Sequence, residues 1–273
     1  MAKPLVVHGE YNGIPITIYG EIHNQIDQSF FEELNVGEDT VWVEHSTQLC
    51  ELMPGQEILF QEAKGLEWIW FTRTLEGKQV RCIDDRIKMG LMSRVEELRL
   101  KDQIDHIEND DMMMVAVEAL VAQFQNVLNV IKETKNWKEH RTDVNPIKTR
   151  MFDRYEDMIN HLPKVMDQSI PFEEMYEKCM NIYHDLCVMS SMLLDIVLIQ
   201  QLKETTDKTP IHLFVGLAHA VRLQHWLQLD VVEPVDPQLV ENIAKIESSL
   251  SGGRKRRKTK RKGINHLKRS HKH

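Results

Sequence analysis

The stretch IPITIYGEIH, residues 14–23, joins an apolar run to a Gly-x-x-His motif, and IHLFVGLAH, residues 211–219, repeats this pattern near the other end of the chain. Each run is short and apolar and breaks at a glycine, which is typical of a buried strand in an α/β sheet. Because glycine lets the chain turn sharply off a strand, His23 and His219 are expected just past strand carboxyl ends. Two histidines placed alike indicate a single site.

Two other strand-like runs also end on charged residues. Residues 40–43 lead into Glu44, and residues 79–83 lead into Asp84 and Arg86. In open α/β sheets the ligand crevice lies outside the carboxyl ends of the strands. These side chains and the two histidines are therefore expected to converge on one cleft.

The order of the segments predicts an α/β fold with a mixed, mostly parallel sheet and long helices, in one domain over residues 1–250. Asn12 and Gly13 separate two strand-like runs, and Asn-Gly supplies the positive φ values of a tight hairpin turn, so one edge of the sheet is expected to be antiparallel. About five to six strands are expected. The apolar periodicity predicts a longest helix that opens at Pro171. Other helices are expected at residues 24–35, 48–63, 66–75, within 85–135, and at 146–161.

Asp195 lies within the apolar run of residues 192–199 on the longest expected helix. An unpaired charge in an apolar interior costs several kcal/mol, so a buried Asp195 would need a partner such as Arg86, His219 or a metal ion. The alternative is that Asp195 lies on a thin exposed strip of the helix.

The charge of the chain is unevenly distributed. Residues 252–273 hold eleven of the 34 Lys and Arg residues and no acid, which leaves 23 basic against 42 acidic residues in the body. Such a segment cannot bury apolar surface, so residues 251–273 are expected to form a disordered tail. The tail predicts nucleic-acid binding or targeting to the nucleus or a virion; the alternatives are a solubilising end or a tail that folds back on the body. Its main cluster is Arg254, Lys255, Arg256, Arg257, Lys258, Lys260, Arg261 and Lys262.

Cysteine usage bears on the cellular compartment. Cys50, Cys82, Cys179 and Cys187 show no Cys-x-x-Cys spacing, and two of them lie in apolar runs. Reduced thiols are therefore expected rather than a disulfide framework, which favours an intracellular location. The start of the chain does not resemble a signal peptide, and the most apolar run, residues 187–199, is too short to span a bilayer. We expect a soluble protein without a membrane span.

Taken together, the motifs resemble those of a known superfamily. The resemblance rests on Gly-Glu-Ile-His at 20–23, a strand closing on Glu44, Asp-Asp-Arg at 84–86, the Asp195-bearing helix and Gly-Leu-Ala-His at 216–219. These are similar to the superfamily that unites ChaN-like proteins, Tiki/TraB metalloproteases and erythromycin esterases. The similarity covers residues 14–229, and the Lys/Arg-rich end also resembles members of this group encoded by large DNA viruses.

The resemblance implies a cleft more firmly than it implies a reaction. Its active-site set would be Glu21, His23, Glu44 and His219, with Asp84, Arg86 and Asp195 close by. Tiki-like members are metal-dependent proteases, erythromycin esterases use a histidine base without a metal, and ChaN-like members are linked to haem binding. This chain is expected to lack the signal or transmembrane segment of the secreted and membrane-bound members, so their extracellular substrates do not carry over.

The residues by themselves permit metal chemistry. A catalytic divalent ion commonly takes two imidazoles and one carboxylate and keeps one position open for water. His23 and His219 would supply the imidazoles, while either Glu21 or Glu44 would ligate and the other would accept the proton. Crowded carboxylates around one cleft favour a cation, which makes this the preferred version. In the metal-free alternative, His23 is the general base and Arg86 stabilises the oxyanion.

Three classes of function follow. The first is a hydrolase of the protease or esterase type that acts on a peptide or small molecule, preferably with a divalent metal ion. The second is a non-catalytic binder of haem or another small ligand, and the third is a nucleic-acid-associated or virion protein that acts through its tail. The chain has no phosphate-binding Gly-rich loop, Gly-x-Ser-x-Gly elbow or His-Glu-x-x-His motif, which disfavours nucleotide-driven and serine-hydrolase chemistry.

The tail generates the first testable prediction. If residues 252–273 make about six phosphate contacts, affinity for nucleic acid should fall on the order of a thousandfold between low and moderate salt. Filter binding at several salt concentrations, with the full chain and a tail-deleted chain, measures this fall. Unchanged nucleic-acid retention and unchanged nuclear accumulation after tail deletion would refute the targeting role.

Overall fold

The computed structural model describes residues 1–22, 27–46, 50, 65–92, 94–133 and 171–250. His23, the basic tail and the helix expected at 146–161 lie outside these residues, as does nearly all of the helix expected at 48–63. The sheet, the helices and the contacts of the fold are those of the described residues.

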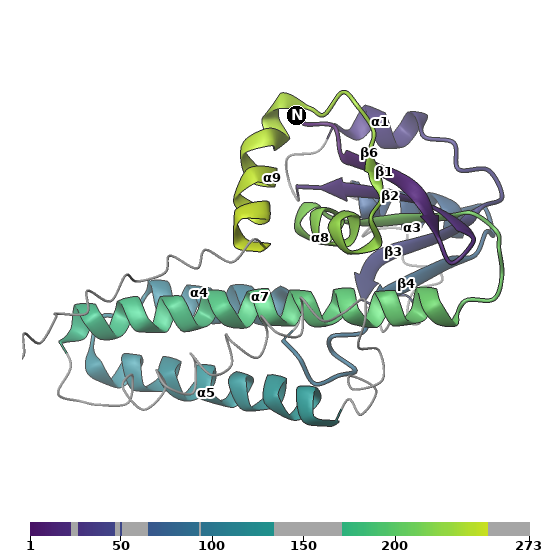
Figure 1. The fold of residues 1–273 in the computed structure, drawn as a ribbon. Helices are drawn as coiled ribbons and strands as arrows, with labels where there is room; N and C mark the ends of the chain where they lie inside the picture. Colours follow the sequence, from purple (N-terminus) through teal and green to yellow (C-terminus); the bar gives the residue numbers. More distant parts are fainter. Residues whose placement is uncertain (23–26, 47–49, 51–64, 93, 134–170, 251–273) are drawn as a thin grey trace, which may run out of the picture.

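A mixed sheet of six strands forms the centre of the fold, in the order β4-β3-β5-β2-β1-β6 (Figure 1). The strands are β1 (Leu5–Tyr11), β2 (Ile14–Glu21), β3 (Thr40–Ser46), β4 (Val80–Asp84), β5 (Ile211–Gly216) and β6 (Asp230–Val231). β2, β5, β3 and β4 run parallel, whereas β1 is antiparallel to both β2 and β6. The predicted α/β class, with a mostly parallel sheet and an antiparallel edge, is confirmed.

The hairpin that joins β1 to β2 turns at Asn12 and Gly13, as the sequence predicts. Asn12 and Gly13 both adopt positive φ, at 53° and 75°, which is the backbone that a two-residue hairpin turn requires. The turn sets the register that pairs Tyr11 with Ile14 and Leu5 with Gly20. The parallel pairing of β2 with β5 brings the carboxyl ends of these two strands together, with Glu21 opposite Gly216.

Helices cover both faces of the sheet. The helices are α1 (Gln28–Glu33), α3 (Leu66–Leu75), α4 (Arg94–Asp105), α5 (Asp110–Glu133), α7 (Phe172–Glu204), α8 (Leu217–Leu227) and α9 (Pro237–Leu250). On one face, α8 lies against β1, β2 and β5, and α4, α5 and α7 pack together beside it (Figure 1). On the other face, α1 and α3 contribute to a smaller core.

Alternation along β3 decides which face receives the site. Val41 and Val43 belong to the smaller core with α1 and α3, whereas Trp42 belongs to the larger core with α5, α7 and α8. Side chains two apart on a strand point to the same face, so Glu44 follows Trp42 toward α7 and α8. His45 points the other way, and its ring lies 4.9 Å from that of Trp70 on α3.

The longest helix is the core helix of the fold. α7 begins directly after Pro171, as predicted, and its second half is buried almost all round. It is long and apolar enough to cross a membrane, but 67% of its most apolar window is buried inside the fold, as in a core helix. Asp195, in the apolar second half of this helix, is 0% exposed. The alternative of an exposed strip is therefore wrong, and the carboxylate needs partners.

Gly20 allows α8 to approach the sheet closely. A Cβ atom at this position would collide with the Cβ of Ala220 and would lie 3.4 Å from the Cα of Leu217. Because β2 carries a glycine here, the first two turns of α8 can lie directly on the end of β2. The glycine of the first Gly-x-x-His motif therefore positions the helix that carries the second histidine.

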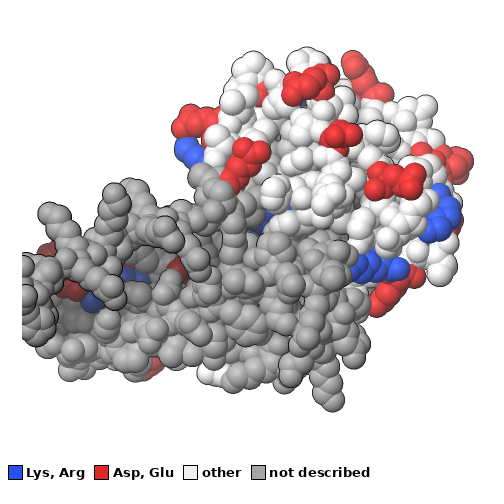
Figure 2. All heavy atoms as spheres, viewed as in Figure 1, with Lys and Arg blue, Asp and Glu red and all other residues white. Residues whose placement is uncertain are grey.

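Acidic side chains predominate over basic ones on the face of the sheet region shown in Figure 2. This distribution agrees with the excess of Asp and Glu over Lys and Arg that the sequence predicts outside the tail.

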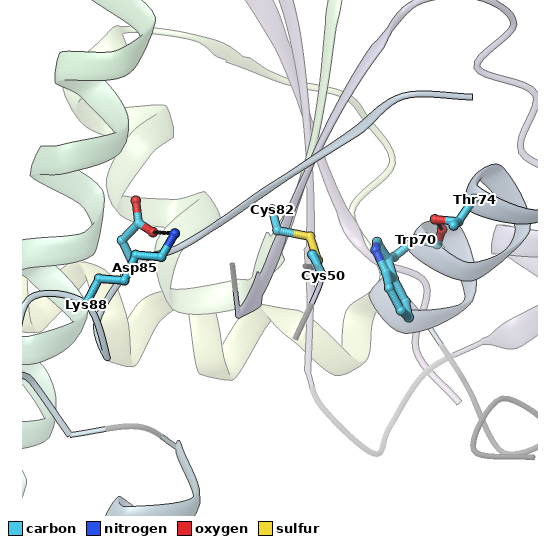
Figure 3. The surroundings of a disulfide bond; sticks show 6 residues. All are labelled: Cys50, Trp70, Thr74, Cys82, Asp85 and Lys88. Atoms are coloured by element: carbon cyan, nitrogen blue, oxygen red, sulfur yellow. Dashed lines mark hydrogen bonds and ion pairs between the residues drawn. A yellow bond between two sulfur atoms is a disulfide. The ribbon is translucent and has the colours of Figure 1, made fainter. Parts of the chain in front are cut away.

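A disulfide joins Cys50, which follows β3, to Cys82 in β4, with a Cα–Cα distance of 6.5 Å. Figure 3 shows it between Trp70 of α3 and the ion pair of Asp85 with Lys88. The prediction that all four cysteines are reduced is wrong for these two, because the fold brings Cys50, beyond the end of β3, within bonding reach of Cys82. Intracellular location stays a prediction that these two cysteines no longer support. Cys179 and Cys187 are thiols, as expected.

The disulfide should stabilise the fold by restricting the unfolded chain. A crosslink between residues 32 positions apart removes unfolded-state entropy worth about 3–4 kcal/mol. Reduction of the wild type, or Cys82→Ser, should lower the free energy of unfolding by this amount in urea titrations. The variant serves as its own control, because its stability should not respond to reductant. Equal stability of the oxidised wild type and the variant would contradict the bond.

Candidate functional site

The ends of β3 and β5 meet at the start of α8. β5 ends at Gly216, and α8 begins at the next residue, so His219 lies in the first turn of the helix. Glu44 bridges the two elements: its Oε2 accepts a hydrogen bond from the Gly216 N–H at 2.8 Å, and its Oε1 lies 3.2 Å from His219 Nε2. The predicted convergence of Glu44 and His219 is confirmed.

The other ring nitrogen of His219 faces the core helix. Nδ1 is hydrogen-bonded to Asp195 Oδ1, while Arg222 Nε donates to Asp195 Oδ2 at 2.5 Å. Arg222 Nη2 also donates to Ser191 Oγ at 2.5 Å. Ser191 and Asp195 are four residues apart on α7, and His219 and Arg222 are three apart on α8, so each pair shares one helix face. The four side chains bind the two helices to each other.

Arg86 organises the carboxylates on the other side of Glu44. It donates to Asp84 through Nε at 2.9 Å and through Nη2 at 2.7 Å, a bidentate pair formed just past the end of β4. Its guanidinium nitrogens also lie 3.6 Å from Glu44 and 3.6 Å from Glu97 of α4. Arg86 is thus the counter-ion of three carboxylates. This engagement leaves it poorly placed for the expected role of stabilising an oxyanion.

These contacts form one continuous ionic chain through the protein. Its members, in spatial order, are Glu97, Arg86 with Asp84, Glu44, His219, Asp195 and Arg222. Every side chain in it except that of Asp84 is at most 8% exposed. Four carboxylates face two guanidinium groups, so a proton on His219 offsets part of the excess negative charge.

The electrostatics of the site follow from this arrangement. Burial alone would lower the pKa of His219, but the charges of Asp195 and Glu44 outweigh it and raise that pKa to about 9. Burial alone would raise the pKa of Glu44, yet His219, Arg86 and the Gly216 N–H hold it far below the usual range. His219 is therefore an imidazolium at neutral pH, between two ionised carboxylates.

The other predicted site residues, Glu21 and His23, are not among the members of the ionic chain. Glu21 is buried at the end of β2. Alternation along β2 places it on the face of Tyr19, opposite to the face that receives Glu44. His23 lies outside the described residues. Across the described ranges, no three His, Cys, Asp or Glu side chains are grouped so that they could hold a metal ion. The metal expectation stays a prediction, and it needs a donor outside these ranges, for which His23 is the candidate.

Sequence reasoning missed three members of the site, namely Arg222, Ser191 and Glu97. Arg222 carried a signal, because a helix that begins after Gly216 places Arg222 one turn beyond His219 and on the same face. Ser191 carried a signal only in combination with Asp195, one turn away on α7. Neither could be assigned without knowing that α7 and α8 pack against each other. Glu97 lies on a helix whose contact with Arg86 the sequence pattern does not specify.

Comparisons of the chain with protein-family models, with curated proteins and with solved structures yield no match. The resemblance to the superfamily of ChaN-like proteins, Tiki/TraB proteases and erythromycin esterases therefore stays a proposal that rests on the motifs.

The raised pKa of His219 predicts how stability depends on pH. The pKa of His219 is about 9 in the folded protein and about 6.5 in the unfolded chain. Protonated His219 therefore makes its full contribution to the free energy of unfolding at pH values below the unfolded pKa. This contribution is lost as pH rises through about 9. The free energy of unfolding should fall by on the order of 2 kcal/mol over this interval. His219→Gln should remove most of this fall, while His225→Gln, exposed on the same helix, should leave it intact. A wild type whose stability is flat over this interval would contradict the shift.

Proposed function

We propose that this protein is a hydrolase of the esterase or peptidase type in which His219 transfers the proton. The observation that carries the proposal is an imidazole at the carboxyl ends of the strands, fixed at Nδ1 by a carboxylate and in contact with Glu44 through Nε2. Catalytic groups of open α/β proteins lie at this edge of the sheet. A buried charged network with a displaced pKa is typical of a catalytic site.

Asp195, Arg222 and His219 have different roles in the proposed acid–base catalysis. Asp195 accepts a hydrogen bond from Nδ1–H and so keeps Nε2 as the nitrogen that exchanges a proton. Arg222 holds Asp195 in place through its second oxygen. Nε2 would take a proton from the attacking group and return it to the leaving alcohol or amine. Since His219 is protonated at neutral pH, the rate should rise about tenfold per pH unit until the pH reaches about 9.

The same geometry favours a hydrolase over a haem binder. An axial histidine must present an unprotonated nitrogen to the iron. In this protein, Nε2 lies 3.2 Å from the Glu44 carboxylate, which favours a proton on that nitrogen. A divalent ion would meet the same proton, and the described residues offer it two donors, Glu44 and His219, rather than three. Metal assistance is thus the second version of this proposal.

Association with nucleic acid, the nucleus or a virion through the tail is a separate proposal that rests on sequence alone.

An assay of the purified full chain on a panel of esters and peptides tests the proposal. His219→Gln should lower kcat/KM by about 100- to 10,000-fold, because a proton-transfer group is lost. His225→Gln should retain the activity of the wild type. Metal content and activity after chelation separate the two versions: loss of activity on chelation supports metal assistance, and retention supports the metal-free site. Inactivity of the wild type across the panel, or full activity of His219→Gln, would contradict the proposal.

A further inference from the structure

We propose that Ser191 is the nucleophile of this site, so that Ser191, His219 and Asp195 act together as a Ser-His-Asp triad. The inference rests on the proposed hydrolase function and adds to it a covalent intermediate and a substrate class, carboxylic esters or amides. The sequence disfavoured serine chemistry because it lacks a Gly-x-Ser-x-Gly elbow. A triad is recognised by its geometry and roles, however, and not by a sequence pattern.

The contacts supply each role of the triad. Ser191 Oγ lies 3.3 Å from His219 Nε2, and the opposite ring nitrogen is bonded to Asp195. Ser191 is half-buried, whereas Asp195 is completely buried. The nucleophile, base and orienting carboxylate are thus arranged in order from the partly accessible side toward the core, as acyl transfer requires.

Arg222 directs the serine proton toward His219. A guanidinium can only donate, so Ser191 Oγ accepts from Arg222 Nη2 and its own single proton is left for another acceptor. In the neutral imidazole whose Nδ1–H is bonded to Asp195, Nε2 is that acceptor. Arg222 Nη2 also lies 3.2 Å from His219 Nδ1, so the guanidinium contacts both the serine and the imidazole. The guanidinium would further stabilise the alkoxide that develops on Ser191.

The reaction balances with water as the only co-reactant. Ser191 Oγ attacks the acyl carbon while its proton moves to His219 Nε2. The bond from the acyl carbon to the leaving oxygen or nitrogen then breaks, and the leaving group takes the proton from Nε2. Water attacks the acyl-serine ester and gives a proton to Nε2, and that proton returns to Ser191 Oγ as the acid departs.

Glu44 determines when the triad is active. Its Oε1 lies 3.2 Å from His219 Nε2 and competes with the serine for that nitrogen. While the ring is protonated, Nε2 donates to Glu44 and cannot accept from Ser191. Labelling is therefore followed from neutral to alkaline pH, so that the neutral form of the ring is sampled.

The neighbouring residue provides a matched control. Ser190 is adjacent on α7, is 1% exposed, and its hydroxyl has no hydrogen-bond partner among the described residues. Ser190→Ala removes a hydroxyl from the same turn of the same helix. It should leave both labelling and turnover close to those of the wild type.

The experiment treats the full chain with a fluorophosphonate and locates the adduct by peptide mass spectrometry, beside turnover on the ester panel. We expect one adduct on Ser191 in the wild type and in Ser190→Ala. The rate of labelling should fall about 100-fold or more in His219→Gln, and turnover should fall similarly in Ser191→Ala. The wild-type adduct is informative even if a variant fails to fold.

The outcomes separate this inference from the proposed function. Turnover in Ser191→Ala equal to that of the wild type, with no adduct on Ser191, overturns the nucleophile while a water-attacking hydrolase stands. An adduct on Ser191 that forms equally fast in His219→Gln overturns the triad. A wild type that neither turns over the panel nor forms an adduct overturns both proposals.

Discussion

The burial of one carboxylate constrains the rest of this structure. Asp195 lies in the most apolar part of the core helix and is completely buried, so its charge must be compensated within the protein. The compensation comes from His219 and Arg222, which both lie on α8. Because α8 follows β5 without a linker, these bonds fix the end of the central parallel strand against α7. The position of the site therefore follows from the bonds that His219 and Arg222 make to the buried Asp195.

The ionic chain extends this constraint across the sheet. Glu44 connects the imidazole to Arg86, and Arg86 connects it to Asp84 and Glu97, so β3, β4, α4, α7 and α8 each contribute a charge to one buried group. Removal of one partner of a buried pair leaves an uncompensated charge and typically costs about 3–5 kcal/mol. A network of this cost is retained more readily where it performs chemistry than where apolar packing would serve. Because His219 lies between the carboxylates of Glu44 and Asp195, it is the imidazole that gains the proton.

The features that could be predicted from the sequence are those determined by neighbouring residues along the chain. The Asn12-Gly13 turn, the strand ends at Glu44 and Asp84 and the helix after Pro171 each follow from backbone preference or apolar period. Arg222 and Ser191 could not be assigned in this way, because their roles depend on the packing of two helices. The pairing of Cys50 with Cys82 likewise depends on the tertiary fold, because the two residues are 32 positions apart in sequence. The sequence grouped Glu21 with Glu44, but strand alternation separates them.

The protonation state of His219 tests the account most directly, because the central claim is that two carboxylates hold a buried imidazolium at the ends of the strands. Heteronuclear NMR of the imidazole nitrogens at neutral pH measures it in the full chain, with assignment by loss of the signal in His219→Gln. We expect both nitrogens of His219 to carry protons at neutral pH and the ring to become neutral as pH rises through about 9. A neutral ring at neutral pH, with one protonated nitrogen, would contradict the account.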